Sequence, residues 1–224
     1  MIEADKQTAD YGHVLLGLPY SDTDNQLISD TMIYEALQRT ATDGPTTFGV
    51  DVARYGNDRT ALTIKTGNRI ETLESWTHAS IVDTVERIRL RASQHQPIDI
   101  RVDDTGVGGG VTDLLKTYGL PVTGINYAGK AKDQQYPNIA SELWFDFATM
   151  LPQLSINPQL ADLPKLTTEL TTRKWHITSR NQRQIESKQD YKDAMNLGSP
   201  DLADSLLLAC YEPPKLPSWD VAVC

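Results

Sequence analysis

The residues most able to do chemistry in this sequence are aspartates set in apolar or glycine-rich surroundings. Asp51 lies inside the stretch FGVDVA, where a carboxylate on the core side is costly to bury unless it is paired or bound to a metal. Asp103 ends the stretch IDIRVD and is followed by the segment DTGVGGG. Open α/β sheets place their active sites at such strand ends, before a flexible turn. The alternatives are a solvent-facing strand end for Asp51 and an ordinary strand-to-helix connection after Asp103.

A second pair of acids, Asp201 and Asp204, lies in the segment SPDLADS near the end of the sequence. Ser199 fits the N-cap of a helix and Pro200 its first residue. The spacing of three residues places both carboxylates on one face of that helix. Acids in a first helical turn also complement the helix dipole, which is a purely structural explanation for them.

Acids on a first strand, at a later strand end and on a late helix can converge on one or two divalent ions. Hard oxygen ligands of this kind suit Mg²⁺ or Mn²⁺. Two such ions, ~3.5 to 4 Å apart, would activate water and stabilise the leaving oxygen in phosphodiester cleavage. Zinc and acyl-transfer chemistry are not indicated, because the histidines are scattered, the two cysteines have no metal-ligand spacing and no GxSxG motif occurs. Neither a Walker loop nor a dinucleotide fingerprint is present.

The elements that must position these acids are those of an α/β domain with a mixed sheet flanked by helices. Short β-rich segments at 47–53, 60–66 and 69–76 predict three sequential antiparallel strands. A one-sided apolar stripe at 79–96 predicts a surface helix, and the strand at 98–103 is expected to return parallel to the first strand. Further elements are predicted as helices at 27–39, 110–119, 138–151 and 199–211, a strand at 121–127 and a hairpin around Asn181 and Gln182.

Length and composition indicate one sizeable domain with appended segments. Of the 224 residues, 39% are hydrophobic and 23% charged, as in ordinary globular proteins. We expect a connector with a helical segment at 1–45, a domain at 46–213 and a tail at 214–224. No long apolar run or signal-peptide pattern occurs, which predicts a soluble, intracellular protein. The net charge of -9 counts against nucleic-acid binding unless bound cations offset the buried acids.

These motifs, in this order, resemble those of the large terminase subunits of tailed double-stranded DNA bacteriophages. FGVDVARYGNDRTAL is similar to the first acidic motif of that family, which implies that Asp51 binds metal. RVDDTGVGGGVTDLL resembles the second motif and implies Asp103 as a ligand, ahead of Asp104. IESKQDYKDAMNLGSPDLADSLLLA resembles the third region and implies Asp204 as the third ligand, with Asp201 assisting.

The resemblance covers residues 46 to 212 and implies a ribonuclease H-like fold. The implied activity is that of a metal-dependent endonuclease, which cleaves concatemeric double-stranded DNA by two-metal-ion hydrolysis with Mg²⁺ or Mn²⁺. The implied catalytic residues are Asp51, Asp103 and Asp204.

The resemblance also indicates contacts and partners. Lys188, in the third region, would contact a phosphate, although a solvated hairpin lysine is the simpler alternative. Gly108 and Gly109 would let backbone approach a phosphate closely. The implied partners are a terminase ATPase domain, the small terminase subunit and the portal protein, and the implied place is the host cell cytoplasm. Because this sequence has no Walker loop, DNA translocation is not assigned to it.

Three other interpretations stay open. An actin-fold ATPase or kinase domain would place phosphate loops on a similar sheet, but that fold needs two such domains and an adenosine site. An inactive nuclease fold could instead serve as a docking module of a packaging motor. Preference for four-way junctions would indicate a junction resolvase, which shares the acids.

Overall fold

The structure is a computed structural model that describes residues 25–53, 59–195 and 198–212. The connector before residue 25, residues 54–58 of the first acidic motif and the tail at 214–224 lie outside the described residues. Within the described part of the chain, no helix combines the length and the apolar character needed to cross a membrane.

A mixed sheet of six strands forms the centre of the fold: β1 (Thr46–Asp51), β2 (Thr60–Thr66), β3 (Arg69–Trp76), β4 (Asp99–Asp103), β5 (Val122–Ile125) and β6 (Ser155–Ile156). Their spatial order is β5-β4-β1-β2-β3-β6. The three sequential strands pair antiparallel, as predicted. β4 returns parallel to β1, which confirms the expected crossover, and β5 is parallel to β4. β6, which the sequence pattern did not predict, pairs parallel with β3 at the edge.

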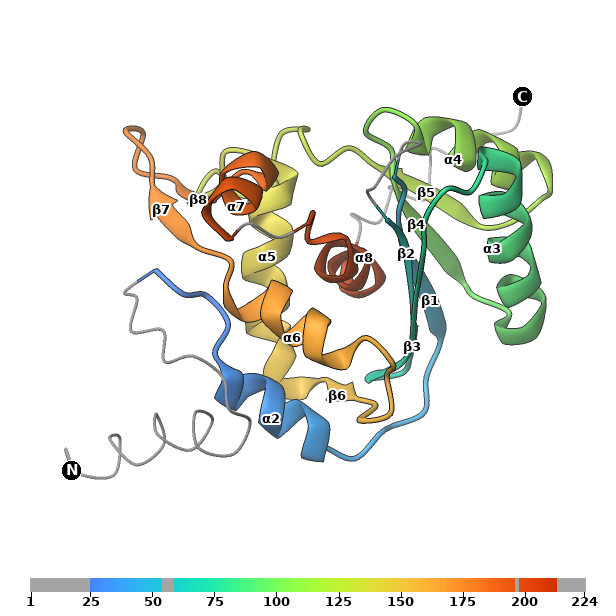
Figure 1. The fold of residues 1–224 in the computed structure, drawn as a ribbon, viewed down its shortest axis with the longest axis horizontal. Coiled ribbons are helices and arrows are strands. Elements are labelled where there is room, and N and C mark those ends of the chain that lie inside the picture. Colours follow the sequence, from blue (N-terminus) through green and yellow to red (C-terminus); the bar gives the residue numbers. More distant parts are fainter. Residues whose placement is uncertain (1–24, 54–58, 196–197, 213–224) are drawn as a thin grey trace, which may run out of the picture.

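One face of the sheet is covered by α3 (Ile81–His95) and α4 (Gly108–Thr117), as Figure 1 shows. Side chains along a strand alternate between the two faces, so every second residue of β1 points to these helices. Phe48 and Val50 are the residues that do so, and both belong to one apolar cluster with the inner sides of the two helices. Burial of this cluster between sheet and helices is the main force that holds this layer.

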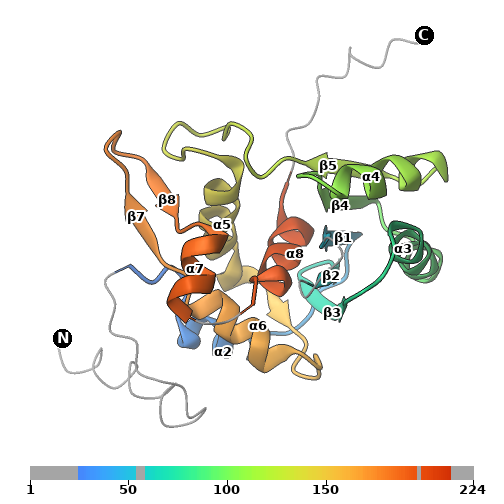
Figure 2. The ribbon, with the colours of Figure 1, turned by 45° about the horizontal axis from the view of Figure 1, so that its top comes forward.

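The opposite face of the sheet receives the other residues of β1, Thr47, Gly49 and Asp51. α8 (Asp201–Cys210) lies on this face, and all ten of its residues are buried. Further helices enclose α8 from outside and share one apolar core with it (Figures 1 and 2). They are α2 (Asp30–Gln38), α5 (Ile139–Met150), the 3-10 turn η1 (Leu151–Gln153) and α6 (Leu163–Thr171).

A two-stranded hairpin of β7 (Trp175–Ile177) and β8 (Arg183–Ile185) projects from the helical layer (Figure 2). It confirms the hairpin predicted around Asn181, which adopts a positive φ of 58° at the turn. The chain continues into α7 (Lys188–Met195), a helix that the sequence pattern did not predict. Lys188 therefore begins a helix and is not a hairpin residue.

α6 is a second helix that the sequence pattern did not predict. Its segment LPKLTTELT is rich in threonine, and β-branched side chains lower helix propensity. The threonine hydroxyls of this region donate to carbonyl groups four residues earlier, which satisfies them inside a helix. These donors are Thr167, Thr168, Thr171 and Thr172.

The predicted N-cap of α8 is wrong. The helix begins at Asp201, Pro200 occupies the N-cap position, and no side chain makes a cap hydrogen bond from there. The Ser199 hydroxyl instead hydrogen-bonds with the Asp201 side chain. The start of α8 is therefore not capped by its own neighbours in the sequence.

Candidate active site

Asp51 and Asp103 stand side by side at the carboxyl ends of two neighbouring parallel strands. The register of β1 and β4 pairs Val50 with Val102, so the next residue of each strand is an aspartate. Both side chains are buried on the face that α8 covers. The Thr105 backbone N–H donates to Asp103 Oδ1 at 3.0 Å and fixes the turn that follows the strand.

α8 brings two further carboxylates over these strand ends because it packs very close to β1. Gly49 permits this approach, since a Cβ at this position would lie 2.0 Å from the Ser205 carbonyl oxygen. The Ser205 hydroxyl also shares a 2.8 Å hydrogen bond with the Thr63 hydroxyl of β2. The first turn of α8, which carries Asp201 and Asp204, is thereby held against the sheet.

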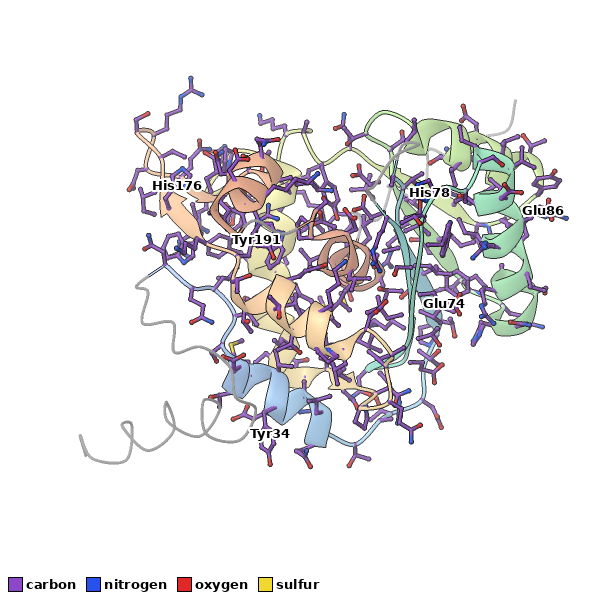
Figure 3. All side chains as sticks on the ribbon, in the orientation of Figure 1. Tyr34, Glu74, His78, Glu86, His176 and Tyr191 are labelled. Carbon is purple, nitrogen blue, oxygen red and sulfur yellow. The ribbon has the colours of Figure 1, made fainter. Side chains whose placement is uncertain are left out.

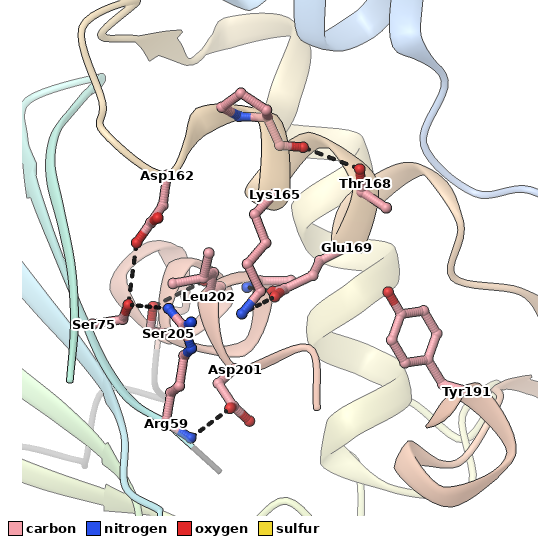
Figure 4. Close-up of polar contacts among 12 residues, drawn as sticks. Arg59, Ser75, Asp162, Lys165, Thr168, Glu169, Tyr191, Asp201, Leu202 and Ser205 are labelled. Atoms are coloured by element: carbon pink, nitrogen blue, oxygen red, sulfur yellow. Dashed lines mark hydrogen bonds and ion pairs between the residues drawn. The ribbon is translucent and has the colours of Figure 1, made fainter. Parts of the chain in front are cut away.

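Hydrogen bonds from other elements hold this first turn. The Tyr127 hydroxyl donates to the Asp204 carbonyl oxygen at 2.9 Å. Asp201 Oδ2 accepts from the Arg59 backbone N–H at 3.1 Å, which ties this acid to the start of β2 (Figure 4). The two acids therefore have different surroundings. Asp201 is hydrogen-bonded to the residue that precedes β2, whereas the Asp204 carboxylate contacts a lysine.

That lysine is Lys188, whose ammonium group lies among the acids. Its Nζ is 2.8 Å from Asp204 Oδ2 and 3.3 Å from Asp51 Oδ2. The Lys188 side chain is 37% exposed as a whole, so part of it reaches solvent while its ammonium group faces the acids. Asp204 Oδ2 is buried without a hydrogen bond of good geometry to any described residue, so the ion pair is what compensates its charge.

Burial governs the protonation of the cluster. Loss of solvent raises the pKa of Asp51 well above its usual range; Lys188 opposes this rise and the neighbouring aspartates add to it. Burial also raises the pKa of Asp103 and of Asp201. Burial alone would lower the pKa of Lys188, but the attraction of Asp204 and Asp51 outweighs it and raises this pKa well above the usual value. The cluster therefore lacks positive charge, which a divalent cation would supply.

The acids lie in a pocket of 550 Å³. The part of the glycine-rich segment that lines this pocket is the turn of residues 105–107. Gly108 and Gly109 follow as the first residues of α4. Gly108 has a packing role in addition, because a Cβ there would lie 1.7 Å from the Asp103 carbonyl oxygen. The four aspartates in the lining are Asp51, Asp103, Asp201 and Asp204.

Asp104 takes a different direction from Asp103. Its carboxyl group packs against Gly124 of β5, where a Cβ would lie 2.9 Å from Asp104 Cγ. Its backbone N–H donates to the Ile125 carbonyl oxygen at 2.9 Å. Of these two neighbouring acids, Asp103 is the one in the pocket lining.

Several other residues of the pocket were not found from the sequence, among them Tyr127, Arg173 and Lys192. Tyr127 follows β5, at the same end of the sheet as the acids. Its position just after a predicted strand was the signal that could have identified it from the sequence. Arg173 is buried, with its guanidinium group 5.3 Å from the centre of the Trp144 ring. Arg173 and Lys192 depend on the placement of α6 and α7, the two helices that the pattern did not predict.

The histidines and the cysteine within the described residues stay apart from the four aspartates and do not line their pocket. His78 and His176 lie on opposite sides of the molecule (Figure 3), and Cys210 is buried at the far end of α8. Among residues 25–53, 59–195 and 198–212, no three acidic, histidine or cysteine side chains converge closely enough to bind one ion as they are placed. Lys188 bridges Asp51 and Asp204, so an ion would have to replace its ammonium group between them.

Neither a protein-family profile nor a curated protein sequence matches the chain. Solved structures do match it. A lysine-to-alanine variant of the nuclease domain from the large terminase subunit of bacterial virus Sf6, with calcium, aligns with a TM-score of 0.73 at 16% identity, covering 84% of this chain and 99% of that one. The chain has the fold of a phage terminase nuclease domain.

Two more structures show the same likeness to terminase nucleases. The Sf6 variant with manganese aligns with a TM-score of 0.71 at 15% identity, covering 84% of this chain and 99% of that one. The large terminase nuclease of thermophilic phage G20c with bound magnesium aligns with a TM-score of 0.60 at 17% identity, covering 84% and 97%. Terminase nucleases have a ribonuclease H-like fold, which confirms the predicted fold class. At these identities the likeness establishes the fold, and the activity must be argued from this chain's own residues.

Proposed function

We propose that this chain is a metal-dependent endodeoxyribonuclease, the nuclease domain of a viral DNA-packaging terminase. The observation that carries the proposal is the meeting of four aspartates, from two parallel strand ends and one buried helix, in a single pocket. Buried carboxylates repel one another and lose solvation, so such a cluster needs cations to offset its charge. The terminase nuclease fold supports this function.

The donor set suits hard divalent ions. All four side chains offer carboxylate oxygens, which Mg²⁺ and Mn²⁺ prefer. Asp204 Oδ2 is buried and faces a cation already, the Lys188 ammonium group. Structures of the similar terminase domains with manganese and with magnesium are consistent with a divalent cofactor here.

In this proposal Asp51, Asp103 and Asp204 hold the ions and Asp201 assists. Two bound ions would supply an activated water and charge stabilisation at the leaving oxygen of a phosphodiester. The carboxylates are carried by β1, β4 and the start of α8, which are rigid elements. Side chains on rigid elements keep their mutual geometry without an ordering step, which lowers the cost of reaching the reactive arrangement.

The chain's own groups also suit a DNA backbone. Lys188 would contact a phosphate once ions take its place beside the aspartates, because its side chain reaches solvent. Lys192 follows one turn later on α7 and lines the same pocket. Gly108 and Gly109 begin α4, whose N-cap residue makes no side-chain hydrogen bond. We propose that their backbone N–H groups contact a neighbouring phosphate.

The biological role that follows is the cleavage of concatemeric double-stranded viral DNA during packaging. Residues 46–213 would form the nuclease unit and residues 1–45 would lead to it from an ATPase domain, with α2 of this stretch packed into the core of the nuclease unit. The small terminase subunit and the portal protein are the further partners that this role requires, in the host cell cytoplasm. The similarity of motifs and fold to large terminase subunits supports this part of the proposal.

Cleavage of supercoiled plasmid with Mg²⁺ or Mn²⁺ tests the activity. Wild type should nick and linearise the plasmid, and a chelator should stop it. Asp51→Asn and Asp103→Asn should be inactive, because each removes a carboxylate from the pocket. Asp113→Asn is the matched control, since Asp113 is an exposed acid of α4 outside the pocket lining.

Two other outcomes of these experiments would favour an alternative function. Equal cleavage by wild type and both site variants would reveal a contaminating nuclease and would favour an inactive docking module. Saturable ATP binding without any cleavage would favour the nucleotide-binding alternative.

A further inference from the structure

The start of α8 needs a hydrogen-bond acceptor that its own sequence does not supply. The first backbone N–H groups of a helix have no partner within the helix. At α8 the N-cap residue is Pro200, which makes no side-chain cap, and all ten helical residues are buried. Buried N–H groups without partners are costly, so an acceptor must come from another element.

Glu169 of α6 provides this acceptor. Its Oε2 accepts a hydrogen bond from the Ala203 N–H at 2.9 Å, across 34 residues of sequence. The Glu169 residue is only 3% exposed. Lys165 Nζ lies 3.5 Å from its other oxygen, Oε1, as Figure 4 shows. Oε1 has no hydrogen-bond partner among the described residues.

Ala203 lies between the two acids of the first helical turn, Asp201 and Asp204. The hydrogen bond from Glu169 therefore acts on the segment of backbone that carries both carboxylates. From the other side, the Tyr127 hydroxyl binds the Asp204 carbonyl oxygen. The turn is thus held between α6 and the end of β5.

The charge of Glu169 argues against a role in stability alone. Burial raises the pKa of Glu169 to about 7; Asp201 and Asp204 add to the rise, while the Ala203 N–H and Lys165 oppose it. A neutral N-cap such as serine would satisfy the helix without this cost.

We propose that Glu169 is a positioning residue for the metal site, holding the first turn of α8 so that the Asp201 and Asp204 carboxylates can bind divalent ions. The inference rests on the proposed function. Among the described residues that line the pocket Glu169 is absent, so it acts through α8 and is not itself a ligand. Residues that orient metal ligands in this way tune affinity without touching the ion.

Two substitutions separate the reach of the side chain from its charge. Glu169→Gln keeps an oxygen that can accept from the Ala203 N–H and removes the charge. Glu169→Asp keeps the charge but is one methylene shorter, so the acceptor is withdrawn. In calorimetric Mn²⁺ titrations of the whole chain without DNA, we expect Glu169→Asp to bind about 10-fold more weakly and Glu169→Gln to stay within about twofold of wild type.

Cleavage kinetics give a second readout. Glu169→Asp should need a higher Mn²⁺ concentration for half-maximal plasmid cleavage, whereas its rate at saturating Mn²⁺ should match wild type. Glu142→Asp is the matched control. Glu142 is also 3% exposed, but it lies on α5, and its carboxylate accepts from the Lys132 and Asp133 backbone N–H groups of the loop before that helix. Its Mn²⁺ affinity should equal that of wild type.

Three results would overturn the inference. Wild-type Mn²⁺ affinity in Glu169→Asp, or the same loss in Glu142→Asp, would leave Glu169 with a role in stability alone. A loss in Glu169→Gln as large as or larger than that in Glu169→Asp would show that the hydrogen bond from the Ala203 N–H does not govern affinity. If wild type itself bound no Mn²⁺ and cut no DNA, the proposed function would fail, and the wild-type titration distinguishes that case.

Discussion

Lys188 Nζ lies 2.8 Å from Asp204 Oδ2, so the acid cluster contains a cation that belongs to the protein. The same Nζ lies 3.3 Å from Asp51 Oδ2 and joins acids from the first strand and the last described helix. An ammonium group carries one charge on a flexible stem, whereas a divalent ion carries two charges and demands several oxygen ligands. Lys188 therefore stabilises the metal-free cluster and would compete with a bound metal ion for the same oxygens.

Replacement of this lysine should separate stability from metal affinity. In Lys188→Met we expect tighter Mn²⁺ binding, because the competing charge is gone. Without metal, the free energy of unfolding should fall by about 1 to 3 kcal/mol, less than for a fully buried pair because Lys188 is partly exposed. Calorimetry and urea unfolding measure the two effects. Lys116→Met, at an exposed position of α4, should change neither. Weaker Mn²⁺ binding in Lys188→Met would contradict competition and make Lys188 an aid to metal binding.

The close approach of α8 to β1 should make Gly49 irreplaceable. In Gly49→Ala the new methyl group would meet the Ser205 carbonyl oxygen at 2.0 Å and the Ala209 nitrogen at 2.3 Å. Backbone atoms of a packed helix cannot yield cheaply, so we expect the free energy of unfolding to fall by about 3 kcal/mol, with Mn²⁺ affinity lost as well. Gly110→Ala is the control, and we expect it to raise the free energy of unfolding. Its Cβ would meet the Ile81 Cδ1 at 3.4 Å, an ordinary contact, and alanine favours the helix more than glycine does. Similar stabilities of the two variants would refute the close packing.

Glu169 should make the metal-free protein less stable as pH rises. Its carboxyl group has a pKa of about 7 when folded, above the ordinary 4.5, so the folded state keeps a proton that the unfolded chain releases between these values. Stability from this group is therefore complete below pH 4.5 and is lost as pH rises through 7. Relative to wild type, Glu169→Gln should gain up to about 3 kcal/mol between pH 4 and pH 8 in urea unfolding. Parallel pH curves for the two proteins would mean that Glu169 titrates normally.

Arg101 should be essential to the other end of α8. Its Nη1 donates to the Ala209 carbonyl oxygen at 3.0 Å and to that of Leu208 at 3.3 Å, and its Nε pairs with Asp99 at 2.8 Å. Arg101→Met takes the charged partner from Asp99 and leaves the Ala209 carbonyl with the Thr47 hydroxyl and the Leu208 carbonyl with the Tyr211 N–H, so we expect a loss of about 3 kcal/mol in thermal or urea unfolding. Arg89→Met removes an exposed ion pair and should cost less than about 1 kcal/mol. Equal effects at the two sites would show that Arg101 does not cap the helix.

Much of the sheet was predictable because its signals are local. In β1 the apolar Phe48 and Val50 alternate with other residues, and this period of two is enough to predict a strand. The three consecutive strands and the parallel return of β4 follow from turn residues and from the handedness of crossovers. Asp51 and Asp103 stood out because charge interrupts or ends these apolar patterns.

The remaining parts depend on contacts that no local pattern shows. α6 reads as a poor helix because its threonines need the helical carbonyl groups before they become favourable. The cap on Ala203 comes from Glu169, 34 residues away, so the local choice of Ser199 failed. The contact of Lys188 with Asp51 spans 137 residues and follows from how α7 docks, which composition and spacing do not specify.

The packing of α8 on β1 also sets when the cluster of four aspartates can form. The Thr47 hydroxyl donates to the Ala209 carbonyl oxygen, 162 residues later in the chain. A nascent polypeptide emerging from the ribosome therefore carries Asp51 and Asp103 long before the helix that completes the centre. Any product truncated before α8 would expose the bare face of its sheet to chaperones and proteases. Such a product would also lack two of the four acids, so under the proposed function only a fully translated domain would cut DNA.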